Sequence, residues 1–150
     1  MDVRSRRRTI VGAGLAALAG ATGGGYAWRQ YDRRNHLRIW HLEVVNESAD
    51  PVTLETVVER DGETLRNETS LAPAGDERGD DRTQLFDRWM KHAAEWDVRA
   101  ERGDRRLELS AGEITDRLEG SGWGTDCAHV VVVVTASGDL EGRVKPSTSC

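Results

Sequence analysis

Five consecutive valines, Val130 to Val134, constrain this chain more than any other stretch. Branching at the β-carbon restricts these side chains in a helix and fits them to the pleated surface of a strand. The run does not alternate with polar residues, and turn-forming residues follow it at 137–139. Such an unbroken apolar run predicts a strand that is buried on both faces. We expect the rest of the chain to be organised around this strand.

Two cysteines flank the hairpin that this strand is expected to form. Gly138 and Asp139 predict a two-residue hairpin turn, because glycine readily takes the positive φ that such a turn needs. A last strand would then run from Leu140 to about Lys145, and its continuation would place Cys150 directly opposite Cys127. This register predicts a disulfide bond between the two cysteines, which would close a loop of about 24 residues.

The formal net charge of −5 conceals a division between the two parts of the chain. Residues 37–150 contain 14 Lys and Arg against 24 Asp and Glu, a net charge of −10, and only two of the basic residues are lysines. A surface rich in carboxylates and poor in lysine resembles that of proteins from extreme halophiles, where salt screens the self-repulsion. Binding to nucleic acid is disfavoured, because phosphates would be repelled.

The first 28 residues resemble a twin-arginine export signal, on the basis of Arg7 and Arg8, the following Thr9-Ile10-Val11, and the absence of charge from Thr9 to Trp28. Two alternatives are open: a signal cleaved near Ala19-Gly20-Ala21, or an uncleaved membrane anchor, since twenty residues of helix at about 1.5 Å each span a bilayer core. A third is a cytoplasmic protein with a buried glycine-rich helix. In the first two, residues 29–36 are a linker and residues 37–150 lie outside the cytoplasm, where disulfides persist.

Short strand patterns recur between turn signals throughout residues 37–150. This recurrence predicts an antiparallel, immunoglobulin-like β-sandwich of about seven strands. Alternation is clear from Val52 to Arg60, and Asp61-Gly62 is a strong hairpin signal. Residues 84–95 fit either a short helix or an irregular turn, and residues 111–126 predict a long loop with at most one helical turn. The expected strands are 37–45, 52–60, 63–71, 96–101, 105–110, the valine strand and 140–145.

In layout the chain resembles the small exported β-sandwich proteins of haloarchaea. The features that carry the resemblance are the twin-arginine segment, an asparagine in the turn after the first strand, the Asp-Gly hairpin, Leu-Ala-Pro-Ala-Gly at 71–75, Trp-Met at 89–90 and the late cysteine pair. These motifs are structural, so the resemblance implies a fold and brings no catalytic residues.

Cys127 and His129 lie two positions apart on one strand, hence on one face, and could begin a metal site. A copper site of cupredoxin type would need a second histidine and usually a downstream methionine, whereas the only methionines are Met1 and Met90. The acidic residues at 76–81 do not match an EF-hand loop, and we expect residues 76–83 to form a solvated loop instead. We therefore expect no metal and no cofactor.

Asn46-Glu47-Ser48 and Asn67-Glu68-Thr69 match the acceptor pattern for N-glycosylation, and both fall on or near expected turns or exposed strand ends. The alternative for Asn46 is an asparagine that forms a turn. Taken together, these patterns favour a non-enzymatic extracytoplasmic module with a cell-surface binding or structural role, whose partner would be a protein or a glycan. It would contact the membrane only through an uncleaved N-terminal segment. The alternative is an exported metal-binding protein or enzyme that uses Cys127 and His129.

Overall fold

The computed structural model describes residues 37–60, 62–85, 93–120 and 127–147. These belong to one compact unit, Arg34–Cys150, which is distinct from Met1–Arg33. The expected export segment with Arg7 and Arg8, the linker at 29–36, residues 86–92 and Cys150 lie outside the described residues.

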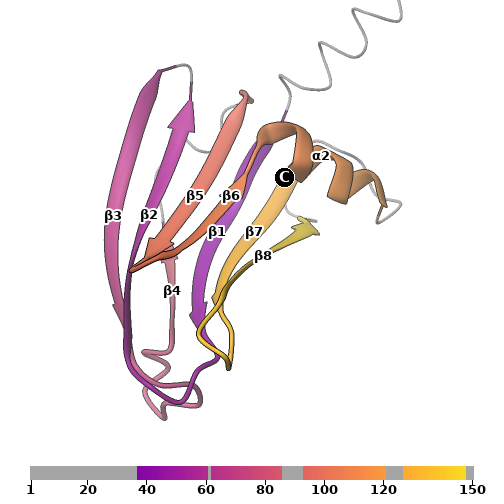
Figure 1. The fold of residues 1–150 in the computed structure, drawn as a ribbon. Helices are drawn as coiled ribbons and strands as arrows, with labels where there is room; N and C mark the ends of the chain where they lie inside the picture. Colours follow the sequence, from indigo (N-terminus) through magenta and orange to yellow (C-terminus); the bar gives the residue numbers. More distant parts are fainter. Residues whose placement is uncertain (1–36, 61, 86–92, 121–126, 148–150) are drawn as a thin grey trace, which may run out of the picture. The chain divides into compact units, whose positions relative to one another are not determined.

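The described residues form two four-stranded sheets and one helix (Figure 1). One sheet has the strand order β4-β1-β7-β8 and the other has the order β3-β2-β5-β6. The elements are β1 (Arg38–Asn46), β2 (Val52–Arg60), β3 (Glu63–Leu71), β4 (Arg82–Leu85), β5 (Trp96–Arg102), β6 (Arg105–Leu109), α2 (Ala111–Gly120), β7 (Cys127–Val134) and β8 (Leu140–Pro146). Buried side chains from both sheets and from the helix form one core, which agrees with the expected β-sandwich.

Two features of the expected sandwich are wrong. The described part of the chain contains an additional short strand, β4, in a stretch that was expected to be loop up to Thr83. In addition, β1 and β7 pair in parallel, so the first sheet is mixed instead of purely antiparallel. A parallel pair needs a long crossover connection, and here the whole second sheet lies between β1 and β7 in the sequence.

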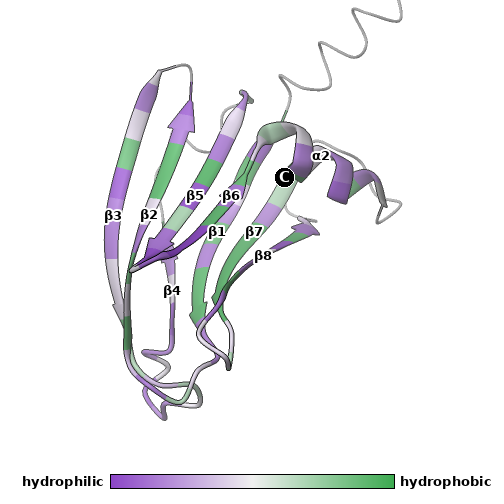
Figure 2. Cartoon of the chain, viewed as in Figure 1, coloured by the Kyte–Doolittle hydropathy of each residue, from purple (hydrophilic) through white to green (hydrophobic). Residues whose placement is uncertain are grey.

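The valine strand is buried on both faces, as predicted. Val130 to Val134 are each no more than 6% exposed, and β7 lies between β1 and β8. Figure 2 shows the valine-rich part of β7 as a hydrophobic run, whereas β3 is mainly hydrophilic. Val130, Val132 and Val134 belong to the core, while Val131 and Val133 face the opposite way.

An ion pair lies on the face of the sheet to which Val131 and Val133 point. Arg143 lies opposite Val131 on β8, and its guanidinium donates hydrogen bonds of 2.7 and 3.1 Å to the two carboxylate oxygens of Glu47, which follows β1. Since β7 lies between β8 and β1, this ion pair spans β7. Long arginine side chains can cover apolar surface with their methylene groups while the charge stays in water.

A β-bulge changes which residues of β1 face the core. The pairing of β1 with β7 shifts between Ile39 and His41. Ile39 and Leu42 therefore both join the core, although strict alternation along a strand would put residues three positions apart on opposite faces. The bulge adds one residue, and this reverses the face because the side-chain period of a strand is two.

On β2 the predicted inward face is confirmed, because Val52, Leu54, Thr56 and Val58 are buried. The opposite face is not wholly wet as predicted, since Val57 is buried as well.

The stretch after β6 is a helix of 10 residues and not the predicted loop. Its side chains at 111, 114 and 118, one face of a helix, are all buried. Ser110 caps the start, since its Oγ accepts a hydrogen bond of 3.2 Å from the amide of Glu113. Glu113 and Arg117, one helical turn apart, form an ion pair of 2.6 Å on the outer side of the helix. Thr115 and Leu118 are buried.

The register of the β7–β8 hairpin differs from the prediction. Val134 pairs with Leu140, and the Thr135 amide donates to the Asp139 carbonyl, so three residues, Ala136 to Gly138, form the loop. Gly138 has the predicted positive φ, 86°. The Gly138 amide donates a hydrogen bond of 2.8 Å to the Thr135 carbonyl and so closes a turn over residues 135–138. A turn that ends in a glycine with positive φ is a common form of the three-residue hairpin loop. Cys127 consequently lies beside Ser147, whose amide donates a hydrogen bond of 3.0 Å to the Cys127 carbonyl.

Candidate binding site at one end of the sandwich

Three connections meet at the end of the sandwich where β1, β5 and β7 finish (Figure 1). They enclose an open hollow of about 440 Å³. The hollow is lined by Ser48 and Asp50 after β1, by the β5–β6 turn at 102–105, and by Ala136, Ser137 and Gly138 of the β7–β8 loop. Connections at one end of a sandwich are a common place for binding sites, because the sheets hold them in fixed positions.

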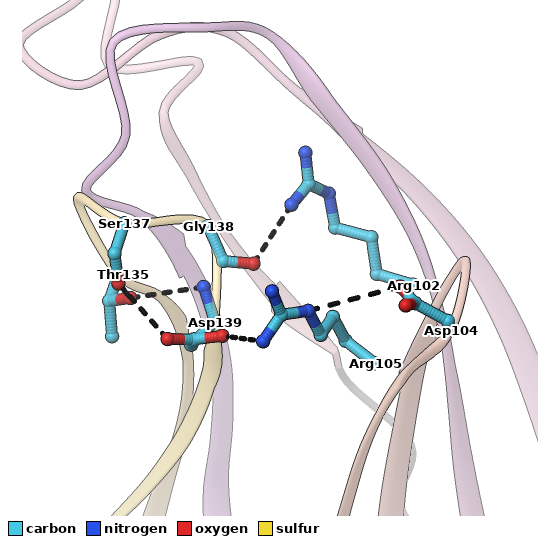
Figure 3. Close-up of polar contacts among 7 residues, drawn as sticks. All are labelled: Arg102, Asp104, Arg105, Thr135, Ser137, Gly138 and Asp139. Atoms are coloured by element: carbon cyan, nitrogen blue, oxygen red, sulfur yellow. Dashed lines mark hydrogen bonds and ion pairs between the residues drawn. The ribbon is translucent and has the colours of Figure 1, made fainter.

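An ion pair joins the two sheets at this hollow. Arg105, at the start of β6, contacts the carboxylate of Asp139, the residue just before β8. Ser137 Oγ donates a hydrogen bond of 3.1 Å to the other carboxylate oxygen of Asp139, and the Asp139 amide donates to Thr135 Oγ1 over 3.1 Å. The β7–β8 loop is therefore held in one conformation by its own side chains and by Arg105 (Figure 3).

Arg102 is the cationic group of the hollow that no carboxylate of the described residues neutralises. Its Nη1 donates a hydrogen bond of 2.9 Å to the Gly138 carbonyl, and its guanidinium forms no ion pair with any described residue. Figure 3 shows the remaining end of this guanidinium directed away from Gly138, without a further partner among the residues drawn. A guanidinium has five N–H donors in a planar fork that matches a carboxylate or sulfate.

The other lining groups are suited to hydroxyl groups. Ser137 and Ser48 contribute hydroxyls, and Asp50 and Asp104 contribute carboxylates, which accept hydrogen bonds from hydroxyl donors. Ser48 is itself held by Asn46, whose Oδ1 accepts bonds of 2.7 and 3.0 Å from the Ser48 hydroxyl and amide. The hollow thus combines the Arg102 guanidinium, which has no carboxylate partner among the described residues, with hydroxyl and carboxylate groups that can accept hydrogen bonds.

A second hollow, of about 640 Å³, lies between the paired ends of β2 and β3 and the start of β4. Its lining includes Pro51, Val52 and Leu71, together with Asp80 and Arg82. Arg82 lies 3.5 Å from the carboxylate of its neighbour Asp81 and is thus partly neutralised. We regard the hollow around Arg102 as the better candidate because its cation is available.

Asn46 is buried and forms the turn after β1, which is the alternative to a glycosylated asparagine. Its Nδ2 donates bonds of 2.8 Å to the carbonyls of Asp50 and Ala72, so both amide hydrogens are used. A glycan on Nδ2 would replace at least one of these bonds at a residue that is 1% exposed. This burial favours the turn-forming role of Asn46, and whether Asn46 carries a glycan stays a prediction.

Asn67, the other expected glycosylation site, is exposed in the middle of β3. It pairs with Thr56 of β2 and is not at a turn or at a strand end. Whether it carries a glycan stays a prediction.

Cys127 and His129 lie on the same face of β7, as predicted, and this face is turned away from the core. They do not form a metal site with the described residues. No group of three His, Cys, Asp or Glu side chains within the described ranges is placed to hold a metal ion. His129 instead lies 3.3 Å from the Glu43 carboxylate and against the ring of His41, at a centroid distance of 5.5 Å. Cys127 is not a free thiol. Its expected partner Cys150 lies outside the described residues, so their pairing stays a prediction.

The acidic stretch at 76–81 is a loop that is exposed from Glu77 to Asp80, as predicted, and two of its carboxylates accept hydrogen bonds from backbone amides. Asp81 is 7% exposed, and its Oδ2 accepts a bond of 3.1 Å from the Gly75 amide. Asp76 accepts bonds from the amides of Arg78 and Asp80. These carboxylates satisfy backbone donors of their own loop and do not converge on a common point.

Comparison with protein-family models, with curated proteins and with solved structures found no match to this chain. Within the described ranges, no helix has the length and apolar character needed to cross a bilayer.

Proposed function

We propose that this protein is a non-enzymatic binding module of an extreme halophile, exported to the outside of the cytoplasmic membrane, and that the hollow around Arg102 is its binding site. The observation that carries this proposal is the Arg102 guanidinium, which opens into a hollow built from both sheets and has no carboxylate partner among the described residues. The ligand we infer is an acidic saccharide at the cell surface.

The support for export comes from the sequence. Arg7 and Arg8 precede an uncharged stretch, as in twin-arginine signals, and the following domain has a net charge of −10, as halophilic proteins do. The membrane would be reached only through residues 1–28, and only if they are not cleaved. We further infer an immunoglobulin-like layout in the broad sense of two packed sheets with binding loops at one end. Its strand order differs from that of immunoglobulin domains.

The support for an acidic saccharide is the chemistry of the lining. A guanidinium binds a uronate or sulfate group through paired N–H donors, while Asp50, Asp104 and Ser137 can accept or exchange hydrogen bonds with sugar hydroxyls. A strongly basic partner is a poorer fit, because Arg102 would repel it. The rival function, metal binding or catalysis through Cys127 and His129, lacks support because Cys127 is not a free thiol.

The test is calorimetric titration of the full-length protein with glucuronate and with glucose in concentrated KCl. We expect saturable binding of glucuronate and at least about tenfold weaker binding of glucose, since a lost charge-assisted hydrogen bond costs about 1.5 kcal/mol or more. Arg102→Ala should abolish the difference. Arg106→Ala is the matched control, because Arg106 pairs with Glu101 and Glu108 and does not line the hollow. Equal binding by wild type and Arg102→Ala would reject this site.

A further inference from the structure

The edge of β3 is the longest strand edge that the described residues leave open. β3 has nine residues and is the outermost strand of its sheet, whereas β4 and β6, two other edge strands, have four and five. The remaining edge strand, β8, is contacted by α2, since Arg117 donates a bond of 2.6 Å to the Gly142 carbonyl. Edge strands present unpaired backbone groups and can pair with another chain.

The backbone groups on this edge can be assigned from the hairpin register. Arg60 pairs with Glu63 across a two-residue turn, so this pair closes the β2–β3 ladder and the odd-numbered residues of β3 bond to β2. The even-numbered residues then direct their N–H and C=O groups outward. Ala72, the next even-numbered residue after β3, also directs its backbone groups away from β2. Its amide donates to the Asp80 carbonyl, and its carbonyl accepts a hydrogen bond from Asn46 Nδ2.

The charges on β3 are incompletely neutralised within one chain. Glu68 lies directly opposite Glu55 on β2, a like-charge pair that destabilises the sheet. Arg66 pairs with Glu55 over 2.8 Å. Among the described residues, no Lys or Arg pairs with Glu68. Arg66, Asn67 and Glu68 are all exposed, so the sequence Arg-Asn-Glu is presented to solvent.

We propose that β3 pairs antiparallel with β3 of a second copy of this chain, about a two-fold axis at Asn67. In this register Arg66 lies opposite Glu68 of the second copy, and Glu68 lies opposite Arg66 of the second copy, so the unpaired carboxylate gains a cation in both directions. The outward-facing residues 64, 66, 68 and 70 supply the backbone bonds, with the two Asn67 residues forming the non-hydrogen-bonded pair between them. The same face is thus complementary to itself, as a two-fold interface requires.

The contact is weaker than that of an obligate dimer. A single strand edge buries less than the roughly 1,600 Å² of a standard interface. Such pairing becomes important when the local concentration is high, for example among many copies at one surface. A crosslinking experiment is therefore more sensitive than a measurement of mass in dilute solution.

The test compares Asn67→Cys with Ser70→Cys in the full-length protein under mild oxidation in concentrated KCl. The axis brings the two position-67 Cα atoms to about 4.5 Å, within the range of a disulfide. Ser70 is exposed on the same strand, but its counterpart lies six residues away along the partner strand, about 20 Å. We expect rapid disulfide dimers from Asn67→Cys and not from Ser70→Cys. Equal rates in the two variants would overturn the proposal.

A second experiment reverses the charges at positions 66 and 68 in the Asn67→Cys variant. The crosslinking rate is measured at the lowest salt at which the protein stays folded, because salt screens exposed charges. Glu68→Arg places the new arginine opposite Arg66 of the second copy and should slow crosslinking of Asn67→Cys about tenfold, because two attractive pairs become repulsive. Adding Arg66→Glu restores opposite charges and should restore the rate. Crosslinking that is indifferent to these changes would contradict the register. A glycan on Asn67 of the native protein would also overturn the proposal, because two glycans cannot occupy the axis.

Discussion

Gly142 of β8 lies directly against Leu109 of β6, and a β-carbon on Gly142 would approach the Leu109 Cδ1 to 2.7 Å. The two residues belong to different sheets, and Leu109 is 1% exposed. This contact therefore sets how closely the sheets approach each other. Arg117 of α2 adds a bond to the Gly142 carbonyl, so the helix and both sheets meet here.

Gly142→Ala should destabilise the domain by about 1–3 kcal/mol, because the new methyl group overpacks a buried contact. Gly112→Ala in α2 is the matched control, since its β-carbon would meet only Ser110 Oγ, at 4.0 Å. In a helix that change should be neutral or stabilise by up to about 1 kcal/mol. Chemical unfolding in constant salt measures both. Equal effects at the two glycines would contradict the packing described.

Asn46→Asp should destabilise the domain by about 2–4 kcal/mol, because it removes two buried hydrogen bonds and places a carboxylate beside the carbonyls that accepted them. Asn67→Asp, on the exposed part of β3, should change stability by less than about 0.5 kcal/mol. Glycosylation of the native protein gives a separate test of the buried Asn46. Mass analysis of its tryptic peptides should find Asn46 unmodified. A glycan on Asn46 would show that the turn after β1 is not formed as described.

The pair of Glu47 and Arg143 gives a pH-dependent contribution to stability. The hydrogen bonds from Arg143 lower the pKa of Glu47 below its ordinary value of 4.5, and they raise the pKa of Arg143. Since the folded state favours the ionised Glu47, this contribution is present above pH 4.5 and is lost as the pH falls through the lowered pKa. Both groups are exposed to solvent, so the effect is small and decreases with salt.

An NMR titration of the Glu47 carboxyl carbon should find its midpoint below 4.5 in the wild type and nearer to the ordinary value in Arg143→Met. An unchanged midpoint in that variant would show that the ion pair across β7 does not form in solution.

The predicted disulfide can be tested by counting thiols. Native protein should show no reactive thiol, and reduction should expose one on Cys127 and one on Cys150. Because a bond between them closes a loop of about 24 residues, its removal should cost about 3 kcal/mol. Two free thiols in protein isolated under alkylating conditions would contradict the prediction and reopen a metal role for Cys127.

Much of the fold follows from local patterns in the sequence. The valines of β7, the alternation of β2 and the Asp-Gly turn each determine nearby structure without help from distant residues. The start of α2 also had a local signal, Ser110 followed by Glu113, which matches a capping box. The glycines in that stretch obscured it, because glycine usually weakens a helix.

Other features depend on contacts that no local pattern encodes. Four residues with mixed exposure make β4, and only pairing with β1 makes them a strand. The bulge in β1 and its parallel pairing with β7 also arise from the assembled sheet. The candidate site could not be predicted for the same reason: Arg102 and Gly138 are 36 positions apart, and each is an ordinary turn residue until the two sheets place them together.

The most direct test of the proposed function is an NMR titration of labelled full-length protein with glucuronate in concentrated KCl. We expect saturable chemical-shift changes confined to the Arg102 side chain, the β5–β6 turn and Ala136 to Gly138, and we expect these changes to be lost in Arg102→Ala. Shifts that do not saturate, or that map to another surface while these residues stay unchanged, would contradict the proposed function.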